Sequence, residues 1–322
     1  MRVAGFLNQK LKFVLISTIL LLSFFLLFIA FEWSLADDGH THRFERTHVE
    51  AALLPPSWWP IDSEYKAQMS KLNTSGAWHS LLGTDQLGRD LFARCVVGGA
   101  ISLGIGLFAA FIAVCLGATW GAIAGIKGGK VDVVMMRIVD ILYGLPSIML
   151  VVLISIAASS FISTSQSIPQ SVKEFINVLA LLVAIGTVSW LTVARVIRGQ
   201  VKSIIARPSI DACKILGIPP WRTLVHHILP ALFGPILVYA TLTIPAAMLS
   251  EAFLSFLGIG VREPLPSWGN LVASGLSQLN PVHSRWWLLL WPCLCIAFTL
   301  VTLNWLGQLI QMHVNPKLKD EA

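Results

Sequence analysis

The sequence predicts an all-α, polytopic membrane protein with six transmembrane helices. Two observations support this fold class: 55% of the 322 residues are apolar and only 12% are charged, and the apolar residues gather in long runs. A soluble domain carries about a quarter charged residues. Because so much apolar surface requires an apolar solvent, we expect the chain to lie in a lipid bilayer.

The predicted spans are apolar runs, each long enough to cross a hydrocarbon core of about 30 Å, which takes about 20 helical residues. They cover residues 13–31, 96–126, 138–158, 176–194, 231–257 and 286–310. The first run follows Arg2, Lys10 and Lys12 and precedes a small-x-small sequence at 34–36, so a cleaved signal peptide is the alternative to an anchor. We favour the anchor, because its 19 residues exceed the apolar core of about 7–15 residues in a signal peptide.

The distribution of basic residues predicts the orientation. With the N-terminus inside, the inner segments hold 14 Lys and Arg residues and the short outer segments hold 3. The long outer segment 32–95 holds six more beside nine acids, but long segments weigh little in the positive-inside rule. Both termini are therefore expected in the cytoplasm. The net charge of +6 does not indicate nucleic-acid binding, because the basic residues are spread over the connecting segments.

The segment 32–95 is predicted to be an irregular external segment that ends in an interfacial helix near 86–95. Within it, the run 37–42 (Asp-Asp-Gly-His-Thr-His) has side chains that suit a metal ion, but a solvated polar loop is the better interpretation, and no metal site is expected. Tryptophans at the start of the last run resemble the aromatic belt of a membrane interface. They are Trp286, Trp287 and Trp291.

Small residues in the apolar runs indicate packing rather than chemistry. Gly117, Gly121 and Gly125 share one helical face, which allows another backbone to approach closely. The five cysteines form no C-x-x-C pair, and four of them lie in or beside apolar runs, so we expect small buried side chains. They are Cys95, Cys115, Cys213, Cys293 and Cys295.

The segment 195–230 is predicted to form a helical hairpin outside the membrane. Ala212, Ile215 and Leu216 have helical spacing, Gly217 suits a left-handed cap, and the pair 219–220 (Pro-Pro) suits the start of a second helix. An apolar ridge that enters no membrane requires a groove on another protein. The hairpin therefore predicts a protein partner.

This segment resembles the EAA loop of bacterial ABC importer permeases. The pattern Asp211-Ala212-Cys213-x-x-x-Gly217 is followed after nine residues by His227-x-Leu229-Pro230, where the family has Glu-Ala-Ala-x-x-x-Gly and Ile-x-Leu-Pro. Further stretches resemble the peptide and nickel branch of that family and its C-type subunit: 82–90 (LGTDQLGRD), 136–146, 251–260, 266–269 and 315–319.

The resemblance implies a type I importer permease fold in the bacterial inner membrane that translocates short peptides by alternating access, without a cofactor of its own. Implied partners are a homologous permease subunit, two ATP-binding subunits and an extracytoplasmic binding protein. Residues 1–95 would form the anchor and external segment, and 96–322 the permease domain, with the coupling loop at 195–230. The cargo stays open among dipeptides, oligopeptides, antimicrobial peptides and nickel chelates. The implied ATPase-coupling residues are Asp211, Ala212, Cys213, Gly217, His227, Leu229 and Pro230.

Two acids inside apolar runs are candidates for the translocation path or for pinning helices together. Glu251 lies in a stretch without other charges, and an acid at the bilayer centre costs about 2.5–3.5 kcal/mol, so it should face the protein interior. Asp140 lies nearer the cytoplasmic edge, where Arg137 or Lys130 is the expected partner.

No feature indicates an enzyme. The chain contains no H-E-x-x-H or G-x-S-x-G sequence, and the stretch 125–131 lacks the spacing and the Ser or Thr of a P-loop. Energy must then come from another chain. A secondary transporter is the less favoured alternative, because inverted repeats are not evident.

Overall fold

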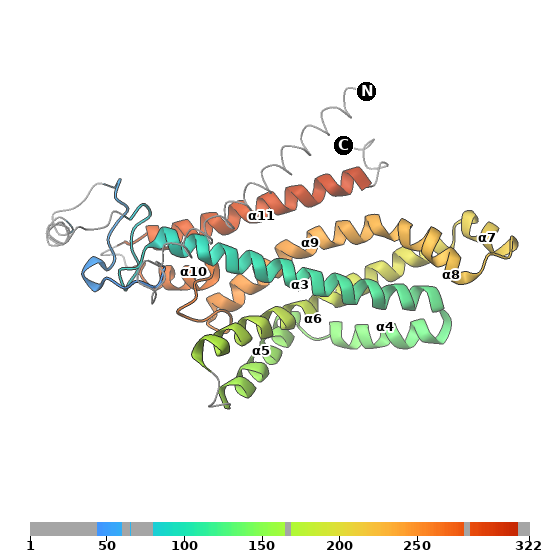
Figure 1. Cartoon of the computed structure of the whole chain (residues 1–322), viewed down its shortest axis with the longest axis horizontal. Helices are drawn as coiled ribbons and strands as arrows, with labels where there is room; N and C mark the ends of the chain where they lie inside the picture. Colours follow the sequence, from blue (N-terminus) through green and yellow to red (C-terminus); the bar gives the residue numbers. More distant parts are fainter. Residues whose placement is uncertain (1–43, 60–64, 66–79, 165–168, 280–283, 315–322) are drawn as a thin grey trace, which may run out of the picture. The chain divides into compact units, whose positions relative to one another are not determined.

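The computed structural model describes residues 44–59, 65, 80–164, 169–279 and 284–314, and in these ranges the chain is helical, with isolated bridges in place of strands (Figure 1). The long helices are α3 (Leu91–Lys127), α6 (Gln170–Ile205), α9 (Leu229–Phe256) and α11 (Trp287–Val314). The shorter elements are η1 (Val49–Ala51), α4 (Gly129–Tyr143), α5 (Ser147–Thr164), α7 (Pro208–Ile215), α8 (Pro220–Thr223), η2 (Leu224–Ile228) and α10 (Trp268–Leu276).

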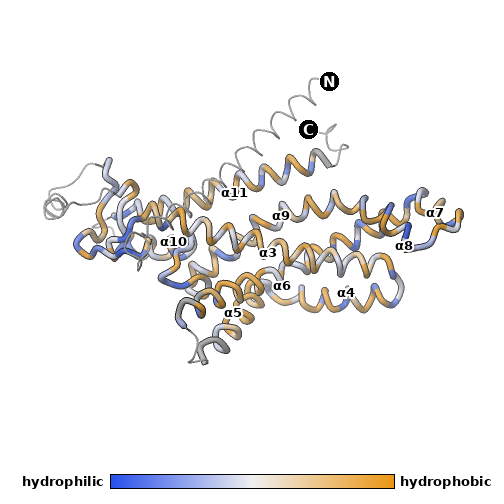
Figure 2. Tube along the Cα trace, viewed as in Figure 1, coloured by the Kyte–Doolittle hydropathy of each residue, from blue (hydrophilic) through white to orange (hydrophobic). Residues whose placement is uncertain are grey.

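In the part of the chain that the structure describes, four helices are long and apolar enough to cross a membrane, and a bent pair raises the number to five. They coincide with predicted spans and are coloured mainly as hydrophobic in Figure 2. The predicted first span, the 37–42 run and the 315–319 motif lie outside the described residues. The structure therefore shows a polytopic all-helical membrane protein.

The predicted third span, 138–158, is wrong as a single straight helix. Its residues belong to α4 and α5, which meet at 84° across a break at 144–146. The break follows from the sequence Gly-Leu-Pro: Pro146 has no N–H for the helical ladder and disfavours the helical region at Leu145.

The chain divides into two compact units. The described residues of the first unit are 105–164, 169–250 and 302–314. Those of the second unit are 44–59, 65, 80–104, 251–279 and 284–301. In the first unit, α4 and α5 both pack against α6. The second unit holds the start of α3, the end of α9, α10 and the first half of α11.

In the second unit, the external segment differs from the expectation at its end. Residues 84–90 form a turn closed by a Thr84–Asp90 bridge, and α3 begins only at Leu91, so the interfacial helix predicted near 86–95 is wrong. The turn needs Gly88 at φ +73°, where a Cβ would collide with the backbone of His48. The Asp90 carboxylate accepts a hydrogen bond from the Phe92 N–H at 3.2 Å, which caps the first turn of α3.

Aromatic contacts hold the external segment to α11. The Trp59 and Trp286 rings lie 4.9 Å apart, and Trp58 approaches Trp286 and Trp291 at 6.5 and 6.3 Å, all in edge-to-face geometry. Helix α10 is an addition to the predicted elements. Ser267 and Asn270 form a reciprocal capping box that starts this helix inside the 266–269 motif.

The cysteine prediction is confirmed in part. All five thiols are free; Cys95 and Cys213 are buried, whereas Cys115 and Cys293 are exposed.

Candidate functional site

The hairpin predicted from sequence is present between α6 and α9. Helix α7 starts with Pro208, and its C-terminus has a complete Schellman motif: Ile218 N–H donates to the Cys213 carbonyl and Gly217 N–H to the Lys214 carbonyl, at 3.0 and 3.1 Å. Gly217 takes φ +71°, as the cap requires. Pro220 then opens α8, which continues through the π-turn η2 into α9, so the predicted helix-turn-helix is confirmed.

The inner face of the hairpin packs on α6. Ile210, Ile228 and Leu232 form one buried cluster with side chains from α6. The α6 members are Val193, Ile197, Val201 and Ile204. These α6 residues lie in the candidate span 175–205, so the hairpin packs directly on a spanning helix of the same unit.

The outer face of the hairpin exposes large apolar side chains. Ile215 is 86% exposed, Leu216 75% and Trp221 60%. Ile215 and Leu216 lie outside the candidate spans, and exposed apolar surface that enters no lipid marks an interaction site. The hairpin therefore presents an unpartnered ridge on a rigid base.

The structure divides the residues proposed for ATPase coupling. Six are exposed and available to a partner: Asp211, Ala212, Gly217, His227, Leu229 and Pro230. Cys213 is the exception, because its side chain is 6% exposed and faces the core. On the exposed side, Lys214 Nζ lies 2.8 Å from the Asp211 carboxylate.

The glycine face of α3 brings that helix against α6. A Cβ at Gly121 would lie 2.4 Å from the Ala194 carbonyl oxygen, so any larger residue requires the two backbones to separate. Gly117 and Gly125 meet Val193 and Val201 in the same way.

Two ion-pair sites join α4 to α6. Asp132, whose side chain is 5% exposed, accepts hydrogen bonds from Arg198 Nη2 at 2.7 Å and Lys202 Nζ at 2.6 Å. Later in α4 and earlier in α6, Arg195 lies 2.8 Å from Asp140, and its guanidinium covers the Tyr143 ring. The partner of Asp140 expected from sequence, Arg137 or Lys130, is therefore wrong: the helix crossing, not proximity along the chain, selects Arg195.

Comparison with known proteins identifies the family. The sequence matches the family of binding-protein-dependent transport system inner membrane components over residues 117–320. The chain belongs to this family. It is 38% identical over 268 residues to the dipeptide transport system permease protein DppC of Bacillus subtilis, covering 83% of this chain and 78% of that protein. It is 40% identical over 267 residues to the oligopeptide transport system permease protein OppC of Escherichia coli, covering 82% of each.

A solved structure shows the same fold. The chain aligns with the inward-facing MetNI methionine ABC transporter at a TM-score of 0.53 and 16% identity, covering 70% of this chain and 98% of that one. The chain is thus an inner-membrane transport permease with an ABC importer fold, and ATP hydrolysis belongs to a separate protein. Family membership implies an ATPase and a binding protein as partners.

In the second unit of the permease, Glu251 is fully buried near the end of α9. Ser255 Oγ donates a 2.6 Å hydrogen bond to Glu251 Oε1, and the hydroxyls of Ser102 and Ser267 lie close to the same carboxyl group. Ser255 Oγ also accepts from the Val261 N–H at 3.0 Å. The carboxyl group therefore sits where α9, α3 and the loop before α10 meet.

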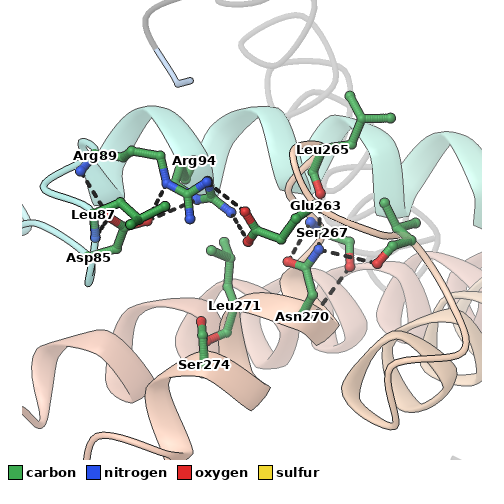
Figure 3. A network of polar contacts seen from close by, with 11 residues as sticks. Asp85, Leu87, Arg89, Arg94, Glu263, Leu265, Ser267, Asn270, Leu271 and Ser274 are labelled. Carbon is green, nitrogen blue, oxygen red and sulfur yellow. Dashed lines mark hydrogen bonds and ion pairs between the residues drawn. The ribbon is translucent and has the colours of Figure 1, made fainter. Parts of the chain in front are cut away.

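A second polar network in this unit joins the turn before α3 to the loop after α9 (Figure 3). Arg89 donates to Asp85 and to Glu263, each at 2.6 Å, and Arg94 donates to Glu263 at 2.7 Å. Burial lowers the pKa of the Arg89 guanidinium, but the hydrogen bond to Glu263 and the charge of Asp85 outweigh it, so this pKa lies above its ordinary value. These contacts anchor the turn at the start of α3.

Sequence reasoning missed several members of these sites, among them Asp132, Arg94 and Glu263. Asp132 had a usable signal, since it is an acid close to a membrane span with several basic residues along the next inner segment. Arg94 and Glu263 are separated by 169 residues, and no local pattern links them.

Proposed function

We propose that this permease translocates short peptides as one half of a permease pair, with a homologous subunit, two ATP-binding subunits and an extracytoplasmic binding protein. Its arrangement would be six spans with both termini in the cytoplasm. Residues 1–95 would form the anchor and external segment, and 96–322 the permease domain. The charge distribution supports this orientation, because it places the 195–230 loop on the side where ATP is found.

The observation that carries the proposal is the exposed apolar ridge on a hairpin whose other face is buried on α6. An ATPase that grips this ridge and moves on closing would displace α6 and the packed start of α9 as one body. Such a rigid-body step exchanges outward and inward openings. The cargo assignment is supported by DppC and OppC, whose names give dipeptide and oligopeptide transport.

We further propose that Glu251 pins helices rather than contacts cargo. Its side chain is fully buried, and Oε1 accepts from the Ser255 hydroxyl of the same helix. The Ser102 and Ser267 hydroxyls of neighbouring segments lie close to the carboxyl group, although Oε2 has no hydrogen-bond partner among the described residues. Asp140 is also proposed as a pinning residue, through Arg195.

Coupling is tested by placing a charge on the ridge. Leu216→Asp should preserve the fold, since the side chain is 75% exposed. It should reduce both copurification of the ATPase and peptide uptake by about tenfold or more, because an unpaired carboxylate is costly to bury in an interface. Val49→Asp is the matched control, since Val49 is 74% exposed and lies outside the hairpin. Equal copurification of the ATPase with both variants would refute the coupling role.

Cargo and topology are tested separately. Cells that depend on this system should take up a labelled dipeptide or oligopeptide, and unlabelled peptide should compete with it, whereas a nickel chelate should not. Uptake of nickel without peptide competition would favour the nickel alternative. A cysteine introduced at Leu216 should be modified by a membrane-impermeant thiol reagent only after cell lysis, with Cys115 and Cys293 replaced beforehand.

A further inference from the structure

The network at the start of α3 contains a buried cation with unused hydrogen-bond donors. The Arg94 side chain is 1% exposed, and its one hydrogen bond among the described residues joins Nη2 to Glu263 Oε1 at 2.7 Å. Its Nε and Nη1 atoms have no hydrogen-bond partner there, and the nearest other acid, Asp85, lies 3.6 Å from Nε. Because a guanidinium offers five donors and buried donors are nearly always satisfied, this group can donate more hydrogen bonds to a carboxylate than it donates to Glu263.

The carboxylate that bridges the two arginines is the exposed member of the network. Glu263 uses one oxygen for Arg89 and the other for Arg94, but its side chain is 54% exposed, whereas those of the arginines are 9% and 1% exposed. Figure 3 shows it reaching from the loop toward both guanidinium groups. An exposed carboxylate contributes little as an ion pair, and another carboxylate makes the same charge-assisted bonds. Glu263 is therefore replaceable.

The surroundings favour a protein as the source of that carboxylate. Asp85, Arg89 and Glu263 lie outside the candidate spans 91–127 and 220–256, and Arg94 lies in the first turn of α3, at the very end of its span. A translocation path follows the length of the spanning helices. Exposed apolar side chains lie in the same unit, as is typical of a protein interface. They are Leu81, Leu87, Trp58 and Trp59. The family requires a binding protein, and the proposed orientation puts these loops on its side of the membrane.

We propose that the guanidinium groups of Arg89 and Arg94 form a carboxylate-binding site that Glu263 occupies in this structure, and that an acidic side chain of the binding protein replaces Glu263 when it docks. This inference rests on the proposed topology. Docking would release the loop that carries the Ser267 cap of α10. The exchange keeps the charge balance of the site, because one carboxylate leaves as another enters.

The first test removes the internal competitor. In the purified complete transporter, reconstituted in lipid nanodiscs, Glu263→Gln should bind the system's own purified binding protein about fivefold more tightly, because both guanidinium groups are then available. The matched control is Glu50→Gln, which removes the same charge from an exposed position of the same unit. Its affinity should stay within about twofold of wild type, because Glu263, not Glu50, bridges the two guanidinium groups. Equal or weaker binding by Glu263→Gln would overturn the proposal.

The second test removes the site while keeping its charge balance. The double variant Arg94→Gln with Glu263→Gln loses one positive and one negative charge, and it should bind at least about tenfold more weakly than Glu263→Gln alone. If both variants bind the binding protein with wild-type affinity, this inference is refuted and the proposed function still stands. No binding by wild type would refute both. A third outcome is that both variants keep the wild-type affinity for the binding protein but lose transport of peptides with a free carboxylate, while amidated peptides are still transported. This outcome would identify the cargo as the occupant of the site and overturn the proposal.

Discussion

The two ion-pair clusters of the permease distribute exposure in opposite ways. In the first unit, the acid Asp132 is buried, and its cationic partners Arg198 and Lys202 are 30% and 46% exposed. In the second unit, the cations Arg89 and Arg94 are buried, and the shared acid Glu263 is half-exposed. Both oxygens of Asp132 are bonded, whereas Arg94 keeps unused donors among the described residues. We therefore interpret Asp132 as a brace and the Arg89–Arg94 pair as a site.

The largest effect on stability is expected at the brace. Asp132→Asn keeps the shape but removes the charge from three charge-assisted hydrogen bonds, which should lower the free energy of unfolding by about 2 kcal/mol. The measurement is thermal unfolding of the detergent-purified permease. A variant as stable as wild type would show that the α4–α6 contact does not depend on this acid.

A smaller loss of stability is expected at the incompletely satisfied cation. Arg94→Met keeps most of the side-chain volume, and Glu263 remains paired with Arg89, so we expect a loss of about 1 kcal/mol or less. Binding-protein affinity should nevertheless fall in this variant. If Arg94→Met is less stable than Asp132→Asn in the same assay, the contrast between brace and site is wrong.

A still smaller effect is expected at the neighbouring exposed pair. The Arg195 and Asp140 side chains are 42% and 56% exposed, so Asp140→Asn should cost about 0.5 kcal/mol or less. Comparing the unfolding temperatures of Asp140→Asn and Asp132→Asn isolates the effect of burial on the strength of the ion pair, since both acids pair α4 with α6. Similar losses in the two variants would show that burial is not the deciding variable.

The smallest effect is expected at Glu251. Gln keeps an oxygen that accepts from Ser255, so Glu251→Gln should retain assembly, with peptide uptake within about twofold of wild type. Glu251→Leu removes the acceptor and serves as the contrasting variant. Normal assembly with strongly reduced uptake in Glu251→Gln would instead show that the charge takes part in transport.

The sequence by itself determined four of the membrane-spanning helices and the local shape of the hairpin. The length and hydropathy of an apolar run decide whether the segment can span the lipid bilayer. Gly217 and Pro220 fix the turn of the hairpin through backbone geometry that depends on adjacent residues only. The pattern at 211–230 indicates the family for the same reason, since all of its residues lie within one short stretch of the chain.

Only the tertiary structure decided which distant side chains meet. The pairing of Asp140 with Arg195, the burial of Cys213 and the bridge from Glu263 to two arginines depend on how helices and loops approach one another. The 84° angle between α4 and α5 belongs to the same class, since Gly-Leu-Pro breaks the helix but does not set the angle at which the two helices pack on α6. Local patterns specify conformations of a few residues, whereas contacts across 55 to 174 positions are set by packing of the whole unit.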